Sequence, residues 1–65
     1  MMMMTLEERV RGEFLEMPGL RLTPEQAARL WATDRVTSEH VLDRLASAGF
    51  LARTTHGAYL RSSMA

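Results

Sequence analysis

The sequence contains no cysteine, no lysine and no long apolar run. Without cysteine, neither disulfides nor thiolate zinc sites can reinforce the fold. The two histidines, His40 and His56, are too far apart in sequence to suggest a closed metal site, so we expect neither a metal nor a cofactor. No stretch approaches the roughly 18 apolar residues that span a membrane, and Met1 to Met4 lacks the flanks of a signal peptide. We therefore expect a cytoplasmic protein without a membrane partner.

The residue sets of common enzyme active sites are also missing. The chain has no glycine-rich phosphate loop and no serine, histidine and acid at a recognisable spacing. A chain of 65 residues buries only about 60% of its unfolded surface, which leaves no room for a buried ligand pocket. We expect a non-enzyme that is stabilised by helix packing or by a partner subunit. A homodimer is a reasonable expectation, with the first helix and the methionine-rich N-terminus as its seam.

Local signals predict a first helix that begins after Thr5. Thr5 and Glu8 have the spacing of a capping box, and Pro18-Gly19 ends the helix. Gly12 lies in the middle of this helix, where we expect another backbone to approach closely. The apolar residues at helical spacing, which we expect to be buried, are Leu6, Val10, Phe14 and Met17, with Leu15 beside them.

Two further helices follow at short spacing. Thr23-Pro24-Glu25-Gln26 is a strong start signal, and we expect this second helix to bury Ala27, Leu30 and Trp31. Asp34 is a good N-cap for a third helix. One face of that helix carries Ser38, Val41, Leu42, Leu45 and Ala48, and the opposite face carries Val36, His40, Asp43 and Ser47. We expect the Ser38 hydroxyl to bond the carbonyl of Asp34, four residues back.

The third helix is followed by a β-hairpin signal. Gly49 fits a left-handed C-cap, and Phe50 can fold back on the helix. The chain then alternates in hydropathy on either side of Thr55-His56-Gly57 and runs to Arg61. Residues 20–22 form an extended link that can add a third strand. The sequence predicts an α+β, mostly α fold, a three-helix winged helix-turn-helix with a C-terminal β-hairpin wing over residues 5–61. We expect residues 1–4 and 62–65 to be flexible.

Residues Thr23 to Arg61 resemble the winged helix-turn-helix regulators of bacteria, especially the GntR and MarR kinds. The corresponding positions are Ala28, Ala32, Thr33, Asp34, Arg35, Thr37, Leu42, Leu45, Gly49, Phe50 and Leu51. Thr33 and Ser38 stand where an apolar residue usually packs in those regulators. In those regulators a glycine commonly stands in the turn, where this chain has Ala32, and a serine caps the helix, where this chain has Asp34. The resemblance implies a transcriptional regulator that binds double-stranded DNA, with the third helix in the major groove.

The chemistry of base and phosphate contact selects the candidate site. Arginine donates a bidentate pair to guanine, threonine bonds a phosphate or touches a thymine methyl, and glutamate accepts from a cytosine amino group. On the third helix the candidates are Arg35, Thr37, Glu39, His40 and Arg44. On the wing they are Arg53, His56 and Arg61, and Arg21 and Arg29 are further candidates for phosphate contact.

The charge pattern also supports an alternative function. Eight arginines balance eight acids, so the chain has no general attraction to nucleic acid. Asp34 to Ser47 carries two arginines against three acids. With Val36 facing outward, this favours a winged-helix module that binds another protein and not DNA. The reading helix would then be a solvated face on which Arg44 pairs with an acid such as Glu39. Trp31 and Tyr59 could stack on bases, but their positions favour the core.

Overall fold

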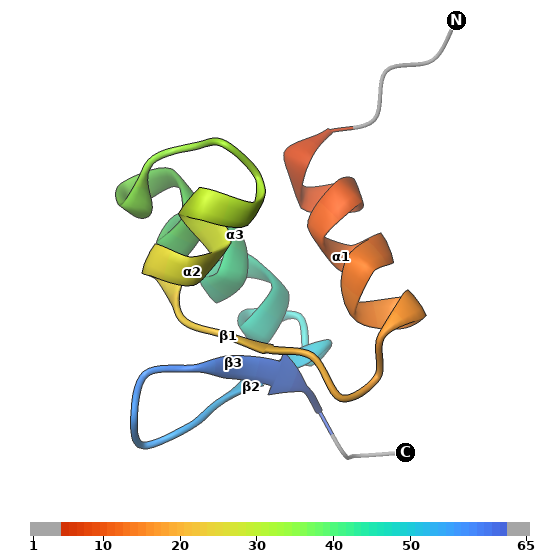
Figure 1. The fold of residues 1–65 in the computed structure, drawn as a ribbon. Coiled ribbons are helices and arrows are strands. Elements are labelled where there is room, and N and C mark those ends of the chain that lie inside the picture. The colour runs from red at the N-terminus through yellow and green to blue at the C-terminus, as the bar shows by residue number, and fades with distance from the viewer. Residues whose placement is uncertain (1–4, 63–65) are drawn as a thin grey trace, which may run out of the picture.

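The computed structural model describes residues 5–62, which form a small, mostly helical α+β fold. The helices are α1 (Leu6–Glu16), α2 (Pro24–Leu30) and α3 (Arg35–Ser47), and the strands are β1 (Arg21–Leu22), β2 (Leu51–Arg53) and β3 (Tyr59–Arg61). The strands form an antiparallel sheet in the order β1-β3-β2. All three helices lie on one side of this sheet (Figure 1). The predicted α+β class is confirmed, and the layout is compatible with a winged helix. The predicted flexible ends, except Ser62, lie outside the described residues.

Capping boxes begin the first two helices, as their sequences predicted. The Thr5 hydroxyl accepts the backbone N–H of Glu8 at 3.1 Å, and the Glu8 carboxylate accepts the N–H of Thr5 at 3.0 Å. Thr23 and Gln26 repeat this exchange at 3.2 Å and 2.9 Å. Each box satisfies two N–H groups that would otherwise lack a partner at a helix start. The positions at which α1 and α2 begin are therefore set by local sequence.

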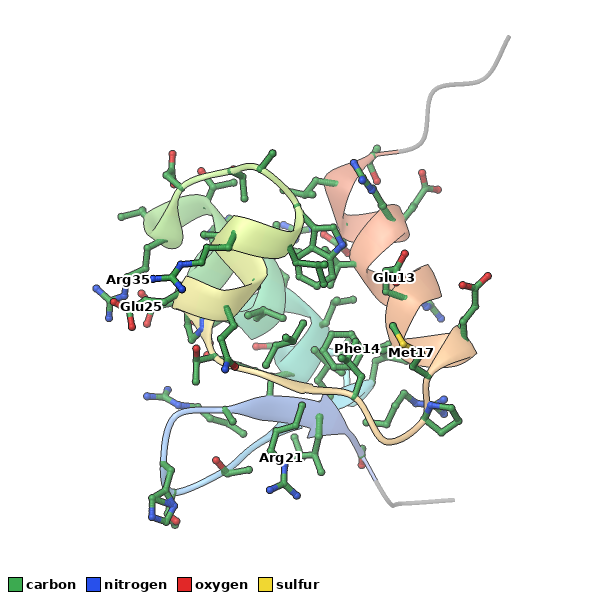
Figure 2. All side chains as sticks on the ribbon, viewed as in Figure 1. Glu13, Phe14, Met17, Arg21, Glu25 and Arg35 are labelled. Atoms are coloured by element: carbon green, nitrogen blue, oxygen red, sulfur yellow. The ribbon has the colours of Figure 1, made fainter. Side chains whose placement is uncertain are left out.

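The core lies between the helices and the sheet. Figure 2 shows Phe14 pointing from α1 into this space, where the side chain is fully buried. Trp31 and Tyr59 are buried in the same cluster, as the sequence favoured. The other members of the cluster are Val10, Leu22, Ala27, Val41, Leu42, Leu45 and Leu51. Every helix and every strand thus contributes to one core.

Three expectations for α1 and α2 are wrong. Met17 is exposed because it follows the last helical residue, with φ −125° and ψ 83°, and leaves the helical spacing. Leu30 is also exposed. The side of the short α2 that faces the core is marked by Ala27 and Trp31, and Leu30 lies outside that side. Gly12 marks no close approach, since a methyl group there would meet no atom of another element within 4 Å.

The ends of α3 follow the sequence closely. After Ala48, Gly49 adopts φ +86° and donates to the carbonyl of Ala46 at 3.0 Å, and Phe50 donates to that of Leu45 at 3.0 Å. These two bonds form a Schellman motif, which confirms the predicted glycine C-cap. The hairpin that follows turns at Gly57, with φ +82°. The predicted third strand is also present, since β1 pairs with β3 through Arg21 and Leu60.

The turn between α2 and α3 contains a strained residue. Ala32 adopts φ +53°, in the left-handed region that costs a non-glycine residue roughly 1–2 kcal/mol. We expect Ala32→Gly to raise the free energy of unfolding by about 0.5–1 kcal/mol, because relief of this strain outweighs the extra chain entropy of glycine. Urea denaturation followed by circular dichroism would measure the change.

Ala28→Gly is the matched control for this prediction. Ala28 lies inside α2, where glycine costs roughly 1 kcal/mol relative to alanine, so the same substitution four residues away should have the opposite sign. A loss of stability in both variants would contradict the strain at Ala32.

No helix within residues 5–62 is long and apolar enough to cross a membrane.

Candidate nucleic-acid interface

Asp34 fixes the first turn of α3. Its carboxylate accepts the backbone N–H of Thr37 at 2.6 Å. This bond, together with one from the Thr37 side chain, holds the pKa of Asp34 below its ordinary value. The predicted N-cap is confirmed, and the carboxylate caps most strongly while it is ionised. The exposed Arg35 is therefore the first residue of a capped helix.

One side of α3 packs on the core and the other side faces solvent. The buried residues are Ser38, Val41, Leu42 and Leu45, and the exposed ones include Val36, His40, Asp43 and Ser47. Val36 is 75% exposed. Helical spacing groups Ala48 with these buried residues. Ala48 is nevertheless exposed, because it is the C-cap and follows the last helical residue. The structure thus presents a continuous outer face of α3 to solvent.

The predicted hydrogen bond of Ser38 is absent. The backbone N–H of Ser38 takes the carbonyl of Asp34 at 3.0 Å. The hydroxyl is buried and has no hydrogen-bond partner among residues 5–62. Ser38 therefore lowers the free energy of unfolding of the domain, because a buried hydroxyl without a hydrogen-bond partner is unfavourable in the folded state.

Arg44 pairs with α1, and not with an acid of its own helix. Its Nε lies 2.7 Å from Oε1 of Glu7, and the two side chains are 62% and 39% exposed. Sequence reasoning missed Glu7 because the partners are 37 residues apart, and no helical spacing links them. Water screens this pair, so it contributes little stability. It does fix where the Arg44 charge lies in the free protein.

A hydrogen bond ties the hairpin to α3. The hydroxyl of the buried Tyr59 in β3 donates to Oδ1 of Asp43. Burial, then the bond to Asp43 and the negative charge of Asp43, raise the pKa of Tyr59 to about 12. Glu39 also raises this pKa and Arg53 lowers it. Two acids of α3 and one arginine of β2 therefore lie close enough to act on this hydroxyl, an arrangement the sequence did not show.

The wing candidates separate into two groups. Arg53 and His56 are exposed, and His56 lies in the hairpin loop, where the Thr54 hydroxyl accepts its N–H at 3.2 Å. Arg61 lies at the other end of the hairpin, opposite Leu51, and is half-buried. Its guanidinium carbon is 4.9 Å from the centre of the Phe50 ring. The structure therefore brings Arg53 and His56 to the loop half of the hairpin and leaves Arg61 at its base.

The remaining α3 candidates are accessible to different extents. Arg35 and His40 are exposed, whereas Thr37 and Glu39 are half-buried. Figure 2 shows Arg35 on the side of the molecule away from α1, and Arg21 pointing away from the helices, beyond the sheet. Arg21 is thus not on the outer face of α3. Arg29 is exposed in the last turn of α2.

An open depression of about 480 Å³ lies between α1 and α3. It is lined by Glu7, His40, Asp43, Arg44, Ser47 and Ala48. Its acids and its arginine are of mixed sign, and no group of His, Cys, Asp or Glu side chains within the described part of the chain is arranged to hold a metal ion. The depression is open to solvent and is not an enclosed ligand site.

Most of the predicted contact residues lie on the outer face of α3 and on the loop half of the hairpin. Together they offer arginine, histidine and threonine donors beside two carboxylates, which suits hydrogen bonding to a polar macromolecule. Comparisons of the chain with protein-family models, with curated proteins and with solved structures found no match.

Proposed function

We propose that the domain is a winged helix-turn-helix that binds double-stranded DNA in the cytoplasm as a transcriptional regulator. In this proposal α3 enters the major groove and the β2–β3 hairpin is a wing on the adjacent backbone. The observation that carries it is the solvent-facing side of α3, which begins at the exposed Arg35. The bond from Tyr59 to Asp43 holds the hairpin beside that face.

The charges near α3 set the expected strength of binding. Arg35 and Arg53 are exposed and have no ion pair among residues 5–62. Arg44 is held by Glu7 in an exposed pair, which is weak enough for a phosphate to replace the carboxylate. With so few cations, one subunit should bind DNA modestly and with a steep dependence on salt.

An amide NMR titration of the labelled protein with a mixed-sequence duplex at low salt tests this proposal. We expect shift changes on Arg35 to Arg44 and around Arg53 and His56, reversed by added salt. Arg35→Ala should lower the affinity about tenfold or more, because a bidentate arginine contact is worth about 1–3 kcal/mol. Two copies per duplex would fit the expected homodimer.

Two variants sharpen the test. Arg9→Ala is the matched control, since Arg9 is exposed on α1 two positions from Glu7 and so points away from Arg44. Its affinity should stay within about twofold of the parent, by comparison with the tenfold loss expected of a contact arginine. Glu7→Gln releases Arg44 and should strengthen binding. A spectrum that does not change at millimolar duplex would end the DNA proposal.

One observation favours a second function, binding to another protein. Val36 is 75% exposed on the outer face of α3, and the acids Glu39 and Asp43 lie further along the same helix. An apolar contact through Val36 would persist at high salt, whereas phosphate contacts weaken as salt rises. Titrations with a DNA duplex and with a partner protein, each repeated over a series of salt concentrations, therefore separate the two functions.

A further inference from the structure

Two arginines from different elements converge on one aromatic ring. The guanidinium carbon of Arg11 in α1 lies 5.1 Å from the centre of the Phe50 ring, and that of Arg61 in β3 lies 4.9 Å from it. Taking the sum of the two distances, the guanidinium carbons are at most 10.0 Å apart. The half-buried ring holds both cations in place through its π-electrons. We refer to these three residues as the Arg11–Phe50–Arg61 cluster.

The arginines of this cluster have no ion pair among residues 5–62. Between residues 5 and 62 the one ion pair is that of Arg44 with Glu7, so neither arginine of the cluster meets a carboxylate. The Nε of Arg61 is buried and has no hydrogen-bond partner among these residues. The buried N–H donor of Arg61, which has no partner, raises the free energy of the free protein. An oxyanion bonded to it would relieve this cost and would be attracted by both guanidinium groups.

We propose that the Arg11–Phe50–Arg61 cluster is a binding site for a phosphate group. Guanidinium groups present a planar fork of N–H donors that matches phosphate oxygens. A phosphomonoester carries about −1.5 to −2 charges at neutral pH, which matches the two arginines better than the single charge of a carboxylate. The Nε of Arg61 supplies a donor that is already free of water.

This site is separate from the outer face of α3. Arg61 pairs with Leu51 at the base of the hairpin, away from the loop that carries His56. Arg11 reaches the cluster from α1, and Phe50 follows the Schellman turn at the end of α3. Phosphate binding here therefore does not depend on DNA binding by α3.

Titration with inorganic phosphate tests the site. The readouts are the NMR signals of the arginine Nε–H groups and of the Phe50 ring, at a pH above the second ionisation of phosphate and at ionic strength held constant with chloride. We expect saturable shifts at Arg11, Arg61 and Phe50. Arg11→Gln and Arg61→Gln should each weaken phosphate binding about tenfold or more, because each removes charged hydrogen bonds. Arg11 is exposed, so its variant keeps the test decisive if Arg61→Gln does not fold.

Arg29→Gln is the matched control, since Arg29 is exposed on α2 and makes no cation–π contact among the described residues. It should leave phosphate binding unchanged. Shifts that rise linearly without saturation, or that are equal at Arg29, would overturn the site, and an equal response to acetate would overturn its preference for phosphate. A duplex arm identifies the source: cluster shifts with free phosphate alone assign a small phosphomonoester, whereas equal shifts with duplex, whose phosphodiesters carry one charge each, would overturn the preference for a doubly charged phosphate.

Discussion

Phe14→Ala is expected to lower the free energy of unfolding by a large fraction of its total. Phe14 is fully buried in the one core, and removal of such a ring costs about 3–5 kcal/mol. A domain of 65 residues has a total stability of roughly 3–10 kcal/mol at the usual value per residue. The loss is therefore a large part of the whole. Circular dichroism in a urea series would measure it.

Leu15→Ala is the control, because Leu15 is the next residue of the same helix and is 53% exposed. Its free energy of unfolding should stay within about 0.5 kcal/mol of the parent, as is usual for exposed positions. The pair tests the rotation of α1 about its axis. Equal losses at Phe14 and Leu15 would mean that α1 packs on the core through a different face.

Stability is expected to fall by about 2–3 kcal/mol between pH 10 and pH 12, because the pKa of Tyr59 rises from 10.0 to about 12 on folding. Below pH 10 the hydroxyl is protonated in both states and its contribution is complete. Above pH 10 the unfolded chain releases this proton first, so unfolding becomes easier as pH rises. Urea denaturation at a series of alkaline pH values would measure the change.

The composition of the chain leaves few other side chains that could affect stability between pH 10 and pH 12. The chain has one tyrosine and no lysine, and arginine stays charged beyond pH 12. Tyr59→Phe should therefore remove the slope between pH 10 and pH 12 almost completely, and Asp43→Asn should reduce it by weakening one of its causes. A slope that persists in Tyr59→Phe would assign the effect to another group.

Local features of this fold could be predicted from sequence, whereas its long-range polar contacts could not. Thr5, Thr23, Asp34 and Gly49 act on neighbours within four residues, so the sequence alone indicates their caps. The hairpin and the third strand followed from turn residues and hydropathy. Glu7 with Arg44 and Tyr59 with Asp43 join residues 37 and 16 positions apart. Those pairings exist only once α1, α3 and β3 have packed.

The same limit applies to the candidate site. Sequence spacing placed Val36, His40, Asp43 and Ser47 on the outer face of α3, and the structure has them exposed there. It could not separate Arg53 from Arg61, because both flank one hairpin loop and only strand register shows which end each occupies. The contact of Phe50 with Arg11 depends on the docking of α1, and its contact with Arg61 depends on the register of β2 with β3.

The strand order β1-β3-β2 has a consequence for the synthesis of the chain. The central strand is the last of the three to leave the ribosome, and it carries Tyr59 into the core. Until residues 59–61 emerge, neither β1 nor β2 has its partner, and each leaves an open edge. The helices can form while the chain is still growing, but the sheet closes only after translation has passed β3. The central strand is thus the last part of the sheet that the growing chain can supply.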